Sequence, residues 1–370
     1  MSHDRQNQDQ EDLQRAERLL GMVNSSWMSQ ATCVAAELGI ADLLGGGPKN
    51  PDELAAATGC HAPSLGRLMR ALASLELCQE DEQGSFRLTP LGSLLRTDAP
   101  NSVRSWAIWW GKYLWPVWAH LRYSVTTGKS ARPLVTGDQG FDHLQRDAGM
   151  AGVFHRAMAE LTRLEARELV AAYDFSACNR VVDVGGGYGE LLAAILKAHP
   201  RMRGILFDLP QAAHGATRHL EELRVAHRFE FVAGDFFESV PSGADIYVLK
   251  NILHDWDDEH VAIILRNCRR AMSEDARLLV VERMMDLRME SSRRHQGMAR
   301  SDLNMLVALG GRERTKDEFG TLLDGQGFRI ARVVPIGLDF SIIDAAPAAD
   351  SRRGSTEPGA AVAVRKETRP

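Results

Sequence analysis

Residues 180–192 read RVVDVGGGYGELL. A short, mostly apolar run leads into a glycine-rich turn, which is the order of strand and turn in an α/β ligand-binding unit. A nicotinamide-binding turn of the form GxGxxG would have glycine where Glu190 stands. A P-loop is also excluded, because no lysine followed by serine or threonine closes the turn. The glycines therefore allow a close backbone approach to a ligand, without evident provision for a pyrophosphate.

The alternation continues beyond this turn. Helical stretches of about 10 to 15 residues separate further apolar runs, namely RGILFD (203–208), RFEFVAG (228–234), ADIYVLK (244–250) and ARLLVVE (276–282). From Asn179 onward this pattern indicates parallel βαβ units in a doubly wound, Rossmann-like α/β sheet, where ligands bind beyond the carboxyl ends of the strands. The residues ending the runs are therefore the first candidates for a site: Asp183, Asp208, Asp235, Lys250 and Glu282.

Two of these acids suit a nucleoside. Asp208 ends the second run, where an acid is the usual partner of a ribose diol. Asp235, after the third run, could accept a hydrogen bond from an adenine amino group, with Phe236 or Phe237 packed on the ring. Taken singly, each acid could equally be a helix cap or a solvated loop residue. Their occurrence at successive strand ends after a glycine turn favours a cofactor that contains a nucleoside.

The N-terminal part predicts two helices followed by a hairpin. Asn50 is a candidate N-cap, with Pro51 at the first helical position, Glu53 as the capping-box partner and a stop at Gly59. A second helix is expected over 62–77, and two short strands follow. Together these elements predict a mainly α winged-helix module.

Winged-helix modules often bind DNA, so a transcription regulator is an alternative function. The second helix, however, offers only Arg67 and Arg70 as exposed cations. The hairpin tip EDEQG (80–84) is acidic where a phosphate contact would need lysine or arginine. A packing or dimerisation role is therefore the simpler prediction.

Five of the seven tryptophans fall within residues 106–118. Trp106, Trp109 and Trp110 have the i, i+3, i+4 spacing of one helix face. Such a face can be a helix–helix core or dimer seam, or a flat aromatic wall beside a ring-shaped ligand. The sequence leaves both interpretations open.

The composition limits the class of protein. The chain has 370 residues, a formal net charge of −5 and a pI near 6.2, so it has no basic excess for binding nucleic acid. The five cysteines are never spaced CxxC, which argues against a disulfide framework or a zinc knuckle. No apolar signal region and no uncharged apolar stretch long enough to cross a membrane are evident. We expect a cytoplasmic protein without a membrane span.

Several segments occur in the order found in the small-molecule O-methyltransferases of the plant and bacterial type. They are VVDVGGGYGELLAAILKAHP, LFDLPQ, AGDFF, LKNILHDWDDE, LLVVERMM and DLNMLVALGGRERT. The chain resembles this family from about residue 20 to 345, and the motifs are specific in combination. The resemblance implies a homodimer formed through a winged-helix dimerisation domain, a catalytic domain that binds S-adenosylmethionine, and an aromatic hydroxylated acceptor from secondary metabolism.

The resemblance also assigns cofactor contacts. The glycine turn should meet the methionine part, Asp208 the ribose hydroxyls, and Asp235 with Phe236 the adenine. The complete set implied on the cofactor side is Thr162, Gly185, Gly187, Asp208, Asp235, Phe236 and Lys250.

Residues 249–260, LKNILHDWDDEH, contain the histidine that the resemblance makes the general base, His254. A phenol with a pKa near 10 is mostly un-ionised at pH 7, and a histidine with an ordinary pKa near 6.5 can accept its proton. By resemblance Glu282 and Glu313 are the flanking carboxylates, one of which would hold the other imidazole N–H. This mechanism needs no metal, and we expect none.

The acceptor is expected to be a flat, mostly apolar aromatic hydroxy compound. His155 stands where family members often have asparagine. Three roles for this residue are open: a second base, a hydrogen-bond donor to a carbonyl of the acceptor, or a side chain that gives the acceptor pocket a different shape. C- or N-methylation, or a reaction that uses the cofactor without methyl transfer, are alternatives on the same scaffold. The residues implied on the acceptor side are His155, Met158, Asp255, Asn304 and Met305.

The composition and the resemblance together divide the chain into five parts. They are a polar N-terminal arm (1–18), a dimerisation domain (19–115), a helical linker with acceptor-pocket residues (116–178), the catalytic domain (179–345) and a disordered tail (346–370).

Overall fold

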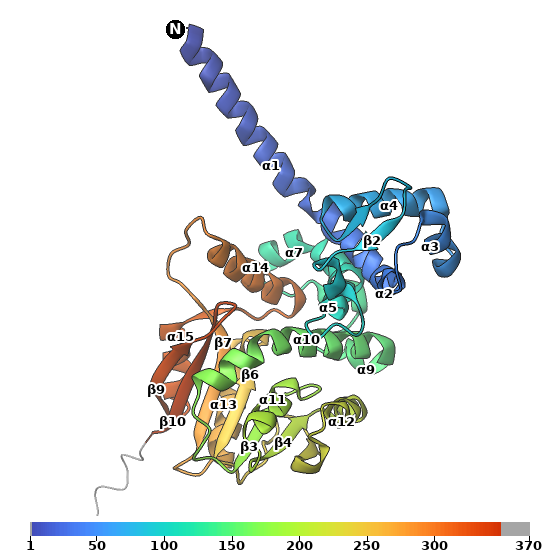
Figure 1. Cartoon of the computed structure of the whole chain (residues 1–370). Helices are drawn as coiled ribbons and strands as arrows, with labels where there is room; N and C mark the ends of the chain where they lie inside the picture. Colours follow the sequence, from blue (N-terminus) through green and yellow to red (C-terminus); the bar gives the residue numbers. More distant parts are fainter. Residues whose placement is uncertain (1, 349–370) are drawn as a thin grey trace, which may run out of the picture.

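The computed structural model describes residues 2–348, and a sheet of eight strands organises the second half of the chain (Figure 1). The strands are β3 (Arg180–Val184), β4 (Arg203–Asp208), β5 (Phe229–Ala233), β6 (Ile246–Lys250), β7 (Arg277–Met285), β8 (Arg314–Thr315), β9 (Phe328–Pro335) and β10 (Phe340–Pro347). Their order is β5-β4-β3-β6-β7-β10-β9, with β8 paired to β7. The five predicted strands, β3 to β7, run parallel, which confirms the doubly wound α/β class. An antiparallel pair, β10 and β9, extends the sheet.

Helices cover both faces of this sheet. Consecutive side chains of β3 enter different cores, Val181 on one face and Val182 on the other, because strand side chains alternate. Burial on both faces explains why the strands read as nearly continuous apolar runs. The covering helices are α10 (Ala148–Ala172), α11 (Glu190–Ala198) and α12 (Ala213–Glu222) on one face, and α13 (Asp258–Ala271) and α15 (Lys316–Gly325) on the other.

The winged-helix elements form as predicted. They are α2 (Ile40–Gly45), α3 (Pro51–Thr58), α4 (Ala62–Ser74), β1 (Cys78–Glu80) and β2 (Phe86–Leu88). The capping box is confirmed, since the Asn50 side chain accepts the Glu53 N–H and the Glu53 carboxylate accepts the Asn50 N–H. β1 and β2 pair antiparallel and close a separate core around Met69 and Phe86.

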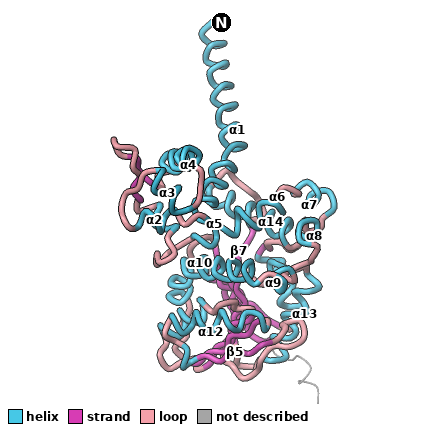
Figure 2. Tube along the Cα trace, turned by 90° about the vertical axis from the view of Figure 1, so that its right-hand side faces the viewer, coloured by secondary structure: helices cyan, strands magenta, loops and turns pink. Residues whose placement is uncertain are grey.

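The first helix, α1 (Ser2–Glu37), extends far beyond the winged-helix elements (Figure 1) and stands clear of the rest of the molecule in the second view as well (Figure 2). It is continuous through residue 18, so the predicted boundary between arm and dimerisation domain falls inside one helix. Among residues 7–37 of this helix, the buried side chains lie near its end, where Cys33 packs against Gly111. Its projecting part exposes the large apolar side chains Leu13, Leu19, Leu20, Met22, Val23 and Trp27.

A helical layer connects the two parts (Figure 2). It contains α5 (Arg104–Ile108), a π-helical turn (Trp109–Leu114), α6 (Trp115–Trp118), α7 (Leu121–Thr127), α8 (Arg132–Thr136), α9 (His143–Arg146) and α14 (Arg293–Ala308). Short 3-10 turns occur at Gly92–Leu95, Pro210–Ala212, Ala226–Arg228 and Leu253–Asp255. Trp109 is buried against Phe154, with ring centroids 5.0 Å apart. The tryptophan-rich stretch is thus an aromatic core between helices.

The end of the sheet changes one predicted boundary. β10 runs to Pro347, so the first two residues of the predicted tail, Ala346 and Pro347, belong to the sheet. The rest of that tail, from residue 349, lies outside the described residues. Within residues 2–348, none of the helices is both long and apolar enough to cross a membrane.

Candidate active site

The glycine turn after β3 meets the carboxylate that ends β4. Asp208 accepts hydrogen bonds from the backbone N–H of Gly187 at 2.7 Å and of Leu209 at 2.7 Å. Burial raises the pKa of this carboxyl, and the two N–H groups oppose the rise. Gly185 and Gly187 have φ of +70° and +58°, a region that L side chains rarely adopt. A Cβ on Gly187 would meet only His155 Nδ1, at 3.5 Å, so its backbone is open to approach.

The other predicted cofactor residues lie along the same edge of the sheet, because neighbouring parallel strands end there. Asp235 follows β5, and its carboxylate accepts the Phe237 N–H at 2.8 Å. Phe236 packs against Trp256 in an edge-to-face contact. Lys250 ends β6, and its Nζ lies 3.0 Å from the carboxylate of Glu165, with both side chains buried.

Helix α10 carries residues predicted for the acceptor side and for the cofactor side of the site. His155 and Met158 occupy its first half, whereas Thr162 lies one turn before Glu165, the partner of Lys250. His155 stacks on Tyr188 of the glycine turn, with ring centroids 4.8 Å apart and planes at 20°. Burial lowers the pKa of His155 to about 4, so its imidazole is neutral near pH 7. The structure therefore places His155 beside the glycine turn.

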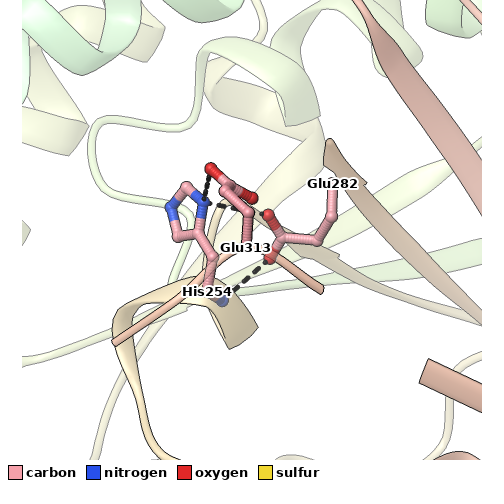
Figure 3. Close-up of side chains that lie close together, drawn as sticks. All are labelled: His254, Glu282 and Glu313. Carbon is pink, nitrogen blue, oxygen red and sulfur yellow. Dashed lines mark hydrogen bonds and ion pairs between the residues drawn. The ribbon is translucent and has the colours of Figure 1, made fainter. Parts of the chain in front are cut away.

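Two buried carboxylates face the Nδ1 side of the His254 ring (Figure 3). Its Nδ1 is 3.1 Å from Glu313 Oε1 and 3.3 Å from Glu282 Oε2. The other oxygen of Glu282 accepts the backbone N–H groups of Ile252 and Leu253, at 3.0 and 2.9 Å. Because both carboxylates face Nδ1, that nitrogen carries a proton, and Nε2, which has Asp255 Oδ1 at 3.4 Å, is the ring nitrogen on the other side.

The surrounding charges change the expected pKa of His254. Burial alone would lower it, but Glu282, Glu313 and Asp255 together outweigh burial and raise the pKa of His254 to about 10. The buried carboxylates therefore hold the pKa of His254 above the ordinary imidazole value near 6.5. Asp255 Oδ1 lies 3.4 Å from Nε2, and burial raises the pKa of Asp255 to about 7. These groups hold more protons near pH 7 than they would in water.

The turn after α14 seats Glu313 against His254. A Cβ on Gly311 would lie 2.1 Å from the His254 carbonyl oxygen, so only glycine permits this contact. Ser301 donates a hydrogen bond to Glu313 Oε1 at 2.6 Å. Arg314 has no exposed surface, and it donates to the carbonyls of Leu253 and Trp256 on either side of His254.

Sequence reasoning missed these positioning residues. In the segment GGRERT (310–315), a glycine pair precedes Glu313 and an arginine stands on each side of it. An arginine inside such a segment can indicate a positioning residue. A buried guanidinium needs several carbonyl or carboxylate partners, and it therefore fixes the backbone around it.

His254, Glu282 and Glu313 also offer ligand atoms that lie within 4.8 Å of one another, as in a small metal site. Hydrogen bonds engage one oxygen of each carboxylate, whereas Glu282 Oε2 and Glu313 Oε2 are buried without a hydrogen-bond partner in the part of the chain that the structure describes. The Nδ1 proton faces the two carboxylates, and Glu282 Oε1 accepts backbone N–H groups. The arrangement is that of a histidine oriented by acids, which is suited to proton transfer.

The acceptor-side residues border the aromatic core. Met158 packs among the partly buried members of that core. Asn304, on α14, accepts a hydrogen bond from Trp118 Nε1 at 2.9 Å, and the neighbouring Met305 is buried. Phe141 links the core to Trp256, two residues after His254, with centroids 6.2 Å apart. The structure thus brings the aromatic core and the histidine together.

Comparisons with known proteins give consistent matches. Residues 118–329 match the O-methyltransferase domain, and residues 20–98 match the O-methyltransferase dimerisation domain. The chain is 44% identical over 329 residues to a phenazine O-methyltransferase of Lysobacter antibioticus, covering 89% of this chain and 95% of that protein. It is 34% identical over 336 residues to a phenazine-1-carboxylate N-methyltransferase of Pseudomonas aeruginosa, covering 91% and 98%.

A solved structure is similar as well. It is an O-methyltransferase from neocarzinostatin biosynthesis in complex with S-adenosylmethionine and 2-hydroxy-5-methyl naphthoic acid. The TM-score is 0.74 at 34% identity, over 86% of this chain and 95% of that one.

Proposed function

The chain belongs to the family of O-methyltransferases with an N-terminal dimerisation domain, and on that premise we propose that it methylates a hydroxyl of an aromatic small molecule with His254 as general base. It is an S-adenosylmethionine-dependent methyltransferase of that family. The hydroxyl acceptor, the role of His254, the homodimer and a place in secondary-metabolite biosynthesis are parts of the proposal. The observation that carries it is the Nδ1 atom of His254 held between Glu282 and Glu313.

The glycine turn and Asp208 suit the cofactor. The backbone at Gly187 is open, and the adjacent Asp208 has the acceptor oxygens that a ribose diol needs. Asp235 and Phe236 would hold the adenine, with Lys250 and Thr162 alongside. When bound, S-adenosylmethionine supplies an electrophilic methyl group.

The residues of this chain align the acceptor and remove its proton. The aromatic core and Met305 would hold the ring, so that its hydroxyl faces His254 Nε2. The proton passes to Nε2, and Glu282 and Glu313 stabilise the resulting imidazolium. The surrounding carboxylates raise the pKa of His254, which makes it a stronger base toward a phenol than an ordinary imidazole. A positive charge bound in the site favours the neutral imidazole that begins this step.

An acceptor screen tests the proposal. Purified protein would be incubated with S-adenosylmethionine and a panel of phenols, naphthols and matched aromatic amines, and methylated products would be identified by mass spectrometry. O-methylation by the wild type and its loss in His254→Gln are expected. Exclusive methylation of the amines, with no loss in the variant, would instead support N-methylation, the activity named for the relative from Pseudomonas aeruginosa.

A further inference from the structure

A second buried polar pair lies on the acceptor side of the site. Arg132, the first residue of α8, is only 3% exposed, and His143 of α9 is 4% exposed. Arg132 Nη1 donates to His143 Nε2 at 3.0 Å, and Arg132 Nε donates to the Ala308 carbonyl at 2.8 Å. Because a guanidinium has only donors, His143 must accept through Nε2 and carry its proton on Nδ1. Neither residue belongs to the group of His254, Glu282 and Glu313 described above.

The charge of Arg132 has no carboxylate partner among the described residues. Its contacts are a carbonyl, a neutral imidazole and the face of Trp109, whose ring centroid lies 5.9 Å from the guanidinium carbon. Burial and the nearby guanidinium lower the pKa of His143 to about 4, so this histidine adds no charge of its own. Moving a cation out of water costs several kcal/mol unless an anion compensates it. A structural arginine in this position would be expected to have an acid beside it, as Arg314 has Asp258.

The pair occupies the wall of the acceptor side. The His143 ring stacks on Trp109, with centroids 6.4 Å apart, and Trp109 packs on Phe154, next to His155. Ala308, which binds Arg132 through its carbonyl, ends the helix that carries Asn304 and Met305. The charges of Arg132 and Asp255 influence each other without forming an ion pair. The backbone agrees, since Ser130 packs near Gly310, and the next residue, Gly311, lies against the backbone of Asp255.

We propose that Arg132, oriented by His143, binds an anionic group of the acceptor, so that the preferred acceptor is an aromatic hydroxy acid. This inference rests on the proposed function, since it names the substrate class of that site. A carboxylate matches the planar fork of a guanidinium. It would bind at the aromatic wall, while the hydroxyl of the same ring faces His254.

The test compares three probes that differ only in one substituent: 3-hydroxy-2-naphthoic acid, its methyl ester and 2-naphthol. Binding to the protein saturated with S-adenosylhomocysteine is measured by calorimetry, which does not depend on methyl transfer. The wild type is expected to bind the acid about 10- to 100-fold more tightly than the ester or the naphthol, the range of a charge-assisted hydrogen bond. Methyl transfer to each probe is measured separately.

Variants assign the preference to the arginine. Arg132→Gln is expected to reduce the affinity for the acid to that for the ester, and to leave affinities for the ester and naphthol unchanged. Arg132→Lys should keep part of the preference, because it keeps the charge but loses the fork. Arg122→Gln, an exposed arginine on α7, is the matched control and should behave as the wild type. Thermal unfolding and S-adenosylhomocysteine affinity verify that each variant is folded.

The outcomes separate this inference from the proposed function. A wild type that does not distinguish the acid, or does not bind it at millimolar concentration, overturns the role of Arg132. Equal weakening of all three probes in Arg132→Gln overturns it too, because that is the result of a structural residue. An acid preference without any methyl transfer would preserve the anion site and refute the proposed O-methylation.

Discussion

His254 Nδ1 and Glu313 Oε1 lie 3.1 Å apart although the two residues come from different turns, one after β6 and the other after α14. The contact depends on Gly311, whose lack of a side chain lets one turn rest on the other. The protonation of the base is thus linked to the packing of two loops.

We expect His254→Gln to reduce kcat by about 10²- to 10⁴-fold, because it removes the group that accepts the hydroxyl proton. Glutamine retains hydrogen-bonding atoms near Glu313, and S-adenosylhomocysteine affinity measured by calorimetry should stay within about twofold of wild type. An unchanged kcat would mean that another residue is the base.

Glu313→Gln should shift the pH dependence of kcat. The wild-type rate is expected to rise with pH, since His254 must be neutral to accept a proton and the surrounding carboxylates raise its pKa. Removing one of the carboxylates that raise this pKa moves the rising limb to lower pH and lowers its plateau. Rate profiles from pH 6 to 10 would reveal the shift, and coincident profiles would show that Glu313 does not act through His254.

Stability should fall as the solution becomes alkaline. Folding raises the pKa of His254 from about 6.5 to about 10, so the folded chain binds the extra proton in that window. This contribution is complete below pH 6.5 and is lost as pH approaches 10, with a slope of at most about 1.4 kcal/mol per pH unit. Denaturant titrations from pH 6.5 to 9.5 should give a smaller slope for His254→Gln than for wild type. Equal slopes would contradict the raised value.

Gly311→Ala should lower both Tm and kcat. The added Cβ would lie 2.1 Å from the His254 carbonyl oxygen and 2.5 Å from the Asp255 carbonyl carbon, and neither backbone can yield without moving the base. Gly320→Ala is the control, because that helical glycine of α15 has no atom within 4 Å of an added Cβ. Similar behaviour of the two variants would show that the contact between the turns is not required.

Asp208→Asn should weaken S-adenosylhomocysteine binding by tenfold or more, since an amide replaces one of the two oxygens that a diol would share. The remaining carbonyl oxygen can still accept the Gly187 N–H, while the hydrogen bond from the Leu209 N–H is lost. Calorimetry and Tm together distinguish lost cofactor contact from misfolding. An unaltered affinity would place the ribose elsewhere.

Local patterns predicted much of this molecule. The capping box at Asn50 and the parallel strands β3 to β7 follow from short-range spacing and hydrophobic periodicity, and the structure confirms both. The general rule that ligands bind at the strand ends brought attention to Asp208 and Glu282.

Long-range geometry was not accessible in the same way. The raised pKa of His254 depends on three carboxylates that converge only in three dimensions. The pairing of Arg132 with His143 joins two short helices whose sequences have no distinguishing periodicity. The predicted end of the catalytic domain at residue 345 is too early, because strand β10 continues to Pro347. The strand ends in alanine and proline, residues that the composition assigns to a tail.

Helix α10 carries His155 and Met158 near one end and Thr162 and Glu165 further along. A helix is a stiff rod, so a displacement at one turn is passed to the next ones. Attempts to engineer acceptor choice through α10 should therefore alter cofactor affinity as a side effect. Positions on α8 or α14 belong to other helices than the one that carries Thr162 and Glu165. They are therefore better starting points for changing the acceptor specificity.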